Sequence, residues 1–204
     1  MGVKNTGNLL TGPNFGTPVV VNGQTTSLAT GSLTTLARAD HVHTVSNVPV
    51  LLASTTLASA AASITFSSIP QTYAKISVMG GAITNYTGGA YEWLVWKFNN
   101  DTGSNYVTTG GTFTNLYQSY AASNSNFSGL MPSIFVHDII NYASTTYHKA
   151  MVAFASVPIS STATGYGIGS SAWKQTAAIT SITITLEHSG NFQAGTSVQL
   201  YGYP

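Results

Sequence analysis

The sequence predicts an all-β protein, a β-sandwich or jelly-roll head that follows an extended N-terminal arm. Short apolar stretches recur along residues 49–204, and most are bounded by Gly, Pro, Asn or Asp. No stretch shows helical periodicity with capping residues. Charged residues make up only 5% of the chain, and Ser, Thr, Asn and Gly take their place. That composition suits a β-rich surface that neighbouring chains partly cover.

Residues 1–48 are predicted to form the arm. Residues 12–18 are dense in turn formers, residues 19–21 suggest one short strand, and residues 27–36 are uncharged and low in complexity. Such a segment buries little apolar surface, so it needs partner chains or another surface to become ordered. The arm closes on residues 37–43, ARADHVH, where the composition changes.

Residues 49–204 are predicted to form the head, with about eight or more strands separated by regularly spaced turn signals. The strands are expected at residues 50–54, 63–69, 73–79, 91–98, 133–140, 147–155, 179–186 and 197–203. Gly80 and Gly81 are predicted to end the third of them. Residues 106–120 are expected to form short strands or a loop, and the Gly/Ser-rich residues 165–174 a surface loop.

Composition excludes several classes of function. The net charge is +1 and no basic cluster exists, so nucleic-acid binding is not expected. The absence of cysteine excludes disulfides, Cys-based zinc sites and thiol nucleophiles. The longest weakly apolar run, residues 48–64, is broken by Pro49 and many Ser/Thr, so we expect no membrane insertion.

No catalytic residues are predicted. Cleavage of a polysaccharide needs two carboxylates in one cleft, and nothing in the sequence pairs Glu92, Asp101, Asp138 or Glu187. No Gly-x-Ser-x-Gly elbow is present. His137 and Asp138 are adjacent, so on a strand they face opposite ways. An enzyme is therefore not expected.

Two parts of the sequence resemble bacteriophage virion proteins. The ARADHVH stretch is similar to an Arg-x-Asp-His-x-His collar that tail-fibre and head-fibre proteins carry between an attachment segment and a distal module. In the head, residues 64–73, 98–106, 139–143 and 198–203 resemble a C-terminal module of phage structural proteins. The resemblance implies a homotrimer on the virion surface that contacts other virion structural proteins, and it leaves tail, neck and capsid placement open.

His41 and His43 are candidate metal ligands. They are one residue apart, so in an extended chain they face the same way. In the trimer that the resemblance implies, three chains would bring six imidazoles together, which suits octahedral iron or another transition metal better than tetrahedral zinc. In the alternative, the histidines stack or hydrogen-bond between chains without metal. No other cofactor is expected.

Aromatic residues in predicted loops are candidate ligand contacts. Trp173 lies in one such loop, and Tyr117, Tyr120 and Phe127 lie in another, with Asn and Ser neighbours. Exposed aromatics of this kind suit stacking on sugars or protein contacts. In the alternative, they fill the head core or the trimer interface.

These observations predict a virion surface protein, a homotrimeric fibre or spike anchored by its arm, whose head attaches to host surface polysaccharide. One alternative is a capsid decoration or cement protein that stabilises the head of the particle without binding a receptor. A glycan-cleaving spike and a cellular lectin-like trimer of the C1q or TNF type remain further alternatives.

Overall fold

The computed structural model describes residues 48–108, 111–113, 116–123, 132–160, 163–188 and 190–204. The predicted arm and collar, up to residue 47, lie outside this part of the chain. All regular secondary structure in the described residues is β-strand, so the all-β prediction is confirmed for them. No helix long and apolar enough to cross a membrane occurs among these residues.

Twelve strands are present in the described part. They are β1 (Val50–Thr56), β2 (Ser63–Phe66), β3 (Lys75–Thr84), β4 (Tyr91–Phe98), β5 (Tyr106–Thr108), β6 (Gly111–Phe113), β7 (Leu116–Ser123), β8 (Ser133–Ile140), β9 (Lys149–Ser160), β10 (Ala163–Trp173), β11 (Ile182–Leu186) and β12 (Ser197–Tyr203). The predicted bounds of β4, β8 and β12 agree with the structure, because each of these segments lies between clear turn signals.

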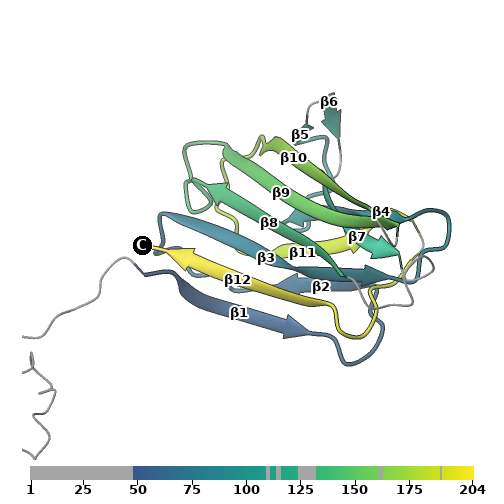
Figure 1. Ribbon diagram of the computed structural model, residues 1–204. Helices are drawn as coiled ribbons and strands as arrows, with labels where there is room; N and C mark the ends of the chain where they lie inside the picture. The colour runs from purple at the N-terminus through teal and green to yellow at the C-terminus, as the bar shows by residue number, and fades with distance from the viewer. Residues whose placement is uncertain (1–47, 109–110, 114–115, 124–131, 161–162, 189) are drawn as a thin grey trace, which may run out of the picture. The chain divides into compact units, whose positions relative to one another are not determined.

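The strands form one large hydrogen-bonded sheet that folds into two layers (Figure 1). One layer has the order β1–β12–β3–β8–β9–β10–β5–β6, and all its neighbours are antiparallel. The other has the antiparallel order β2–β11–β4–β7. A short parallel pairing of β3 with β7, Ile83 with Ala122 and Thr84 with Ser123, joins the two.

The hydrophobic core lies between these layers. Its largest members are fully or almost fully buried: Trp96, Phe98, Tyr106, Phe135, Tyr142, Trp173 and Phe192. On β11, Ile182, Ile184 and Leu186 are buried and the threonines between them are less so. Period-two alternation therefore turns one side chain in two into the core, as expected for a sheet with one covered face.

The predicted end of the third strand is wrong. Strand β3 does not stop at Gly80 and Gly81 but continues to Thr84. A Cβ on Gly80 would lie 2.3 Å from the carbonyl oxygen of Ser197 on the neighbouring β12. Glycine at this position thus allows a close approach of two backbones rather than a turn.

The predicted surface loop at residues 165–174 is also wrong, because residues 165–173 are part of β10. It pairs with β9 from Ala163 to Trp173. Gly165, Gly167 and Gly169 alternate with Tyr166, Ile168 and Ser170 along it. Strict alternation with glycine is compatible with a strand, although glycine-rich segments usually favour turns.

Candidate functional site

An aromatic cluster lies where β4 begins and β7 ends. The ring centroid of Tyr120 lies 4.6 Å from that of Tyr91, edge to face, and 4.4 Å from that of Trp93. Trp93 and Tyr120 are paired across the two strands, next to an irregularity in register before Val95. Tyr91 is 38% exposed, and the other two rings are half-buried. The cluster therefore presents aromatic surface to solvent.

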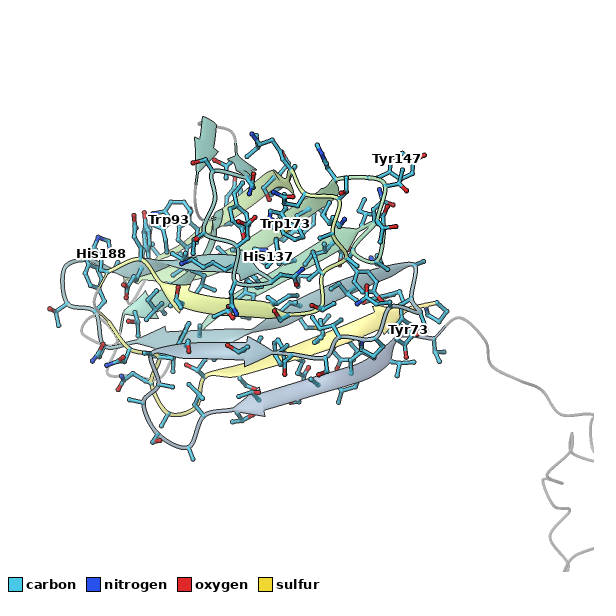
Figure 2. All side chains as sticks on the ribbon, turned by 180° about the vertical axis from the view of Figure 1, so that it is seen from behind. Tyr73, Trp93, His137, Tyr147, Trp173 and His188 are labelled. Carbon is cyan, nitrogen blue, oxygen red and sulfur yellow. The ribbon has the colours of Figure 1, made fainter. Side chains whose placement is uncertain are left out.

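A second ring pair borders this cluster at the same end of the protein, where Figure 2 shows Trp93 and His188 close to one another. The rings of Tyr86 and His188 stack with centroids 4.7 Å apart. The backbone N–H of Glu187 donates to the carbonyl of Trp93, which fixes the chain after β11 beside β4. We refer to Tyr86, Tyr91, Trp93, Tyr120 and His188 as the aromatic end.

The buried carboxylate of Glu92 holds one segment of the aromatic end by a hydrogen bond. Glu92 is 1% exposed and accepts hydrogen bonds from the Thr84 hydroxyl at 2.8 Å and the His188 backbone N–H at 2.6 Å. His188 Nδ1 lies 3.8 Å from Glu92 Oε1 and 3.9 Å from Glu187 Oε2. The structure thus places two carboxylates, which sequence spacing did not connect, within 4 Å of the same imidazole nitrogen.

Gly190 allows the chain to close over this carboxylate. A Cβ at this position would lie 2.5 Å from Glu92 Oε2 and 2.7 Å from Thr84 Oγ1. Both atoms are held by their mutual hydrogen bond, so they have little freedom to move aside. The bonds of Glu92 are thus all to nearby protein groups, and its role in this geometry is to position the His188 segment.

Of the two residues predicted as ligand contacts whose side chains the structure describes, Tyr120 and Trp173, one lies in the aromatic end. Tyr120 is part of it. The backbone of Tyr117 pairs with Val95 in β7, and its side chain lies outside the described part of the chain, as does all of Phe127. Tyr91 and Trp93 were not selected from the sequence. The sequence did hold one signal: Trp93 and Trp96 are three residues apart, so on one strand their side chains face opposite sides. The structure agrees, because Trp96 is fully buried and Trp93 is not.

Trp173 does not lie on the surface. Its side chain is 2% exposed at the end of β10 (Figure 2), and its Nε1–H donates to Asp101 Oδ2 at 2.6 Å. Its ring packs 5.7 Å from that of Phe98 and 6.5 Å from that of Tyr106, between centroids. A buried indole offers no face on which a sugar could stack, so the expectation that it contacts ligand from an exposed loop is corrected.

Asp101 organises the turn that covers Trp173. Besides the indole, it accepts hydrogen bonds from the backbone N–H of Gly103 at 2.8 Å and the amide of Asn105 at 2.9 Å. Burial acts to raise the pKa of Asp101, but these three hydrogen bonds outweigh it and lower the pKa. The turn is therefore held by an ionised carboxylate.

His137 and Asp138 face opposite sides of β8, as predicted. His137 is fully buried, with Nε2 2.9 Å from Ser119 Oγ, whereas Asp138 accepts a hydrogen bond from Lys75 Nζ at 2.6 Å. Among the described residues, His137 Nδ1 has no hydrogen-bond partner. The Ser119–His137 pair thus lacks the orienting acid of a hydrolytic triad, and both side chains are enclosed by protein.

Metal ligation has no candidate in the described part of the chain, where no group of three or more His, Cys, Asp or Glu side chains is placed to hold an ion. The two histidines predicted as ligands, His41 and His43, lie outside the described residues.

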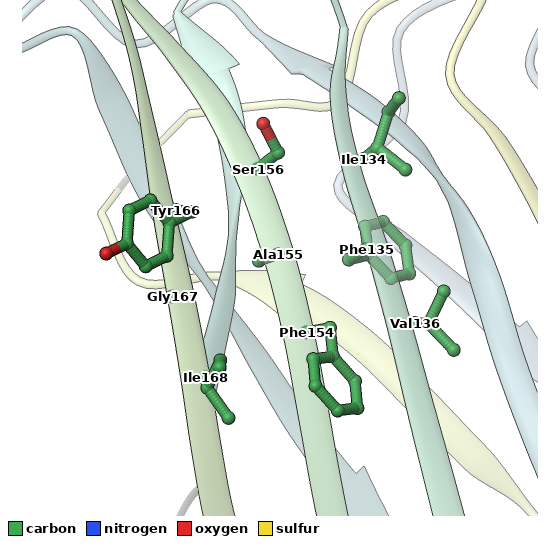
Figure 3. Close-up of a pocket in the computed structure, with 9 residues that line it drawn as sticks. All are labelled: Ile134, Phe135, Val136, Phe154, Ala155, Ser156, Tyr166, Gly167 and Ile168. Carbon is green, nitrogen blue, oxygen red and sulfur yellow. The ribbon is translucent and has the colours of Figure 1, made fainter.

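A second surface feature is an apolar groove of about 350 Å³ on the outer face of β8, β9 and β10 (Figure 3). It is lined by Ile134, Phe135, Val136, Phe154, Ala155, Ser156, Tyr166, Gly167 and Ile168.

Comparisons of the chain with known protein families, with curated proteins and with solved structures find no match.

Proposed function

We propose that the chain is a structural protein of a bacteriophage virion surface, a homotrimeric fibre or spike that binds a host polysaccharide. Residues 1–48 would anchor it to other virion proteins, and residues 49–204 would form the projecting head. The ARADHVH collar and the head segments that resemble phage structural proteins support the virion assignment. The single observation that carries attachment is the aromatic end of the head.

The strand order supports a jelly-roll head. Without β5, β6, β9 and β10, eight strands remain, and lettering them A to H in chain order gives two antiparallel layers, A–H–C–F and B–G–D–E. All consecutive strands except D and E, which pair within the second layer, thus alternate between layers, which is the double-sheet arrangement of a jelly roll. The two hairpins β5–β6 and β9–β10 extend the first layer at one edge.

The chemistry of the aromatic end suits a sugar. The rings of Tyr91, Trp93 and Tyr120 offer apolar faces to the C–H groups of a pyranose, while phenol and indole groups can hydrogen-bond to hydroxyls. Glu187 and His188, both exposed, add polar groups at the border. With a net charge of +1 and few charged residues, the chain lacks the electrostatic attraction that a strongly anionic ligand would exploit.

The test of attachment is binding of the full chain to an array of purified bacterial surface polysaccharides. Trp93→Ala is expected to weaken binding about 5- to 10-fold, since stacking of one aromatic ring contributes on the order of 1 kcal/mol. Tyr147→Ala is the matched control, because Tyr147 is exposed in the turn before β9 and lies outside the aromatic end. If wild type and Trp93→Ala bind the polysaccharide equally well, the aromatic end is not the binding surface.

A capsid decoration protein is the second candidate, and the apolar groove of β8 to β10 favours it. An apolar surface of this kind suits docking onto another protein rather than a sugar. Imaging of virions with this chain located and counted separates the two functions. A few copies at the tail or neck with the aromatic end exposed support attachment, whereas many copies across the capsid lattice with that end covered support decoration.

A metal at the trimer axis is part of the proposal. His41 and His43 from three chains would supply nitrogen ligands, and iron or another transition metal that prefers octahedral coordination would fit such a set. The ion would link the chains where the arm meets the head.

A further inference from the structure

Trp93 of the aromatic end lies in a row of side chains that crosses three strands of one layer. On one side, β4 pairs with β7, which sets Trp93 opposite Tyr120. On the other side, β4 pairs with β11 through Leu94 and Leu186. The backbone N–H of the next residue, Glu187, donates to the carbonyl of Trp93 at 3.1 Å. Since directly opposed residues of neighbouring strands share a face of the sheet, Tyr120, Trp93 and Glu187 lie on one face.

That face is turned away from the core. Leu94 is fully buried and Leu186 is 9% exposed, and both belong to the hydrophobic core. Because side chains alternate along a strand, the residue after Leu186 and the residue before Leu94 point outward. The side chain of Glu187 is 34% exposed, and the ring of Trp93 is half-buried, with that of Tyr120 packed beside it from β7. A ligand that contacts the indole from the β11 side therefore meets the carboxylate of Glu187.

The carboxylate of Glu187 has no hydrogen-bond donor within the described part of the chain. Its one polar contact there is Nδ1 of His188, 3.9 Å from Oε2, which is too long for a hydrogen bond. The imidazole is held instead by stacking on Tyr86, with ring centroids 4.7 Å apart. A carboxylate accepts hydrogen bonds and donates none. Glu187 is thus available to a ligand group that donates hydrogen bonds.

No lysine or arginine of the described residues lies beside Glu187. Lys97 is on the same face of β4, but it pairs with Thr183, four positions along β11 from Glu187, which corresponds to about 13 Å at the rise of a strand. The three other described lysines are on other elements: Lys75 on β3, Lys149 on β9 and Lys174 after β10. The buried carboxylate of Glu92 adds a second acidic group to this end, 3.8 Å from the same imidazole nitrogen. Two acidic groups without a lysine favour a cationic ligand group over an anionic one.

We propose that the polysaccharide bound at the aromatic end contains an amino sugar whose amino group is free. The C–H face of the pyranose packs on the indole of Trp93, and the ammonium group donates to the carboxylate of Glu187 at the edge of the ring. The ammonium group is also attracted by the negative face of the indole. An N-acetylated sugar would still pack on the ring, but its neutral amide would lose both charge-assisted contacts. This inference rests on the polysaccharide binding in the proposed function and names the class of sugar.

The test compares binding of the full chain to an array of purified bacterial surface polysaccharides before and after N-acetylation with acetic anhydride. Acetylation converts a free ammonium group to a neutral amide and leaves the sugar ring in place. Wild type is expected to bind preparations with free amino groups, and acetylation is expected to weaken that binding about 5-fold or more. Glu187→Gln keeps the shape of the side chain and removes its charge, so it should bind the untreated polysaccharide as weakly as wild type binds the acetylated one. Asp138→Asn is the matched control, since it removes the same charge from β8, where Asp138 pairs with Lys75, and it should bind like wild type.

The outcomes separate this inference from the proposed function. If the bound polysaccharide carries no free amino group, or if acetylation leaves its binding unchanged, the amino sugar is excluded, while weaker binding by Trp93→Ala still supports attachment. If Glu187→Gln binds the untreated polysaccharide as tightly as wild type, Glu187 is not the partner of the ammonium group. If wild type binds no polysaccharide, attachment and the amino sugar fail together. The comparison of treated and untreated ligand uses wild type alone, so it decides the inference even if a variant fails to fold.

Discussion

His137 stacks on Trp96 in the core, with ring centroids 4.0 Å apart and planes 26° apart. Its Nε2 lies 2.9 Å from Ser119 Oγ. Burial lowers the pKa of His137 to about 3, and the nearby Asp138 opposes this only in part. The imidazole is therefore neutral in the folded chain and packs as an aromatic ring.

This pKa predicts a stability that falls in acid. The unfolded chain binds a proton on His137 near pH 6.5, whereas the folded chain does so only near pH 3. Between these values the unfolded state binds more protons, so the free energy of unfolding decreases as pH falls, by about 1.4 kcal/mol per pH unit at most. Urea unfolding at a series of pH values from 7 to 4 measures this slope.

His137→Phe keeps an aromatic ring against Trp96 and removes the titration, so its slope is expected to be shallower than that of wild type in this range. His148→Phe is the matched control, because His148 is exposed and its replacement should leave the slope unchanged. If the free energy of unfolding depends on pH equally in wild type and His137→Phe, the pKa of His137 is not lowered by folding.

The bond between Trp173 and Asp101 is expected to be a strong local contribution to stability. Asp101→Ala leaves the buried indole N–H of Trp173 without its acceptor, and we expect a loss of about 2–3 kcal/mol. Trp173→Phe removes the donor as well as part of the ring. Chemical denaturation of wild type, both single variants and the double variant gives the coupling energy.

A non-zero coupling is the decisive result in that cycle. Because Asp101 and Trp173 are in contact, the double variant should lose less than the sum of the two single losses, by about 1 kcal/mol or more. Strict additivity would mean that the turn at Asp101 is held by Gly103 and Asn105 alone.

Alternation of polar and apolar residues predicted most strands of the head, but not the strand in which glycine alternates with larger residues. Strands β4, β8 and β12 were predicted with their bounds, because polar and apolar residues alternate there between turn formers. In β10 the alternation is between glycine and larger residues, so local propensity favoured a loop. The same ambiguity hid the burial of Trp173, whose partner Asp101 lies 72 residues away in sequence.

The candidate site was predicted even less completely, since it depends on contacts between strands. Tyr120 was selected from its Asn- and Ser-rich surroundings. Its partners Tyr91 and Trp93 come from β4, and only the pairing of β4 with β7 brings the three rings together. Sequence spacing within one segment carries no information about that pairing, and a register irregularity before Val95 shifts it further.

Metal analysis tests the proposed role of His41 and His43. The purified full chain is expected to contain iron or another transition metal at about one ion per three chains, as six imidazoles would form one octahedral set. His41→Ala together with His43→Ala should abolish this content. The described part of the chain offers no alternative group of ligands, so metal that persists in the double variant would exclude these two residues as the ligands.

Lys149 is buried and its ammonium group is surrounded by backbone carbonyls. Nζ donates to the oxygens of Ser144 at 2.6 Å, Tyr147 at 2.9 Å, Thr176 at 2.8 Å and Gln175 at 3.2 Å. Burial lowers the pKa of Lys149, while the carbonyl dipoles stabilise its charged form. One side chain thus joins the turn before β9 to the segment after β10.

Lys149→Met is expected to be strongly destabilising. Methionine fills a similar volume but donates no hydrogen bond, so the carbonyls that Lys149 satisfies would be left in a desolvated site, at a cost of about 3 kcal/mol or more. Lys174→Met removes the same charge from a neighbouring exposed position and is expected to change stability by less than about 0.5 kcal/mol. Unfolding midpoints in urea compare the two. Equal midpoints would mean that water replaces the ammonium without loss, and that the two segments are held together by other contacts.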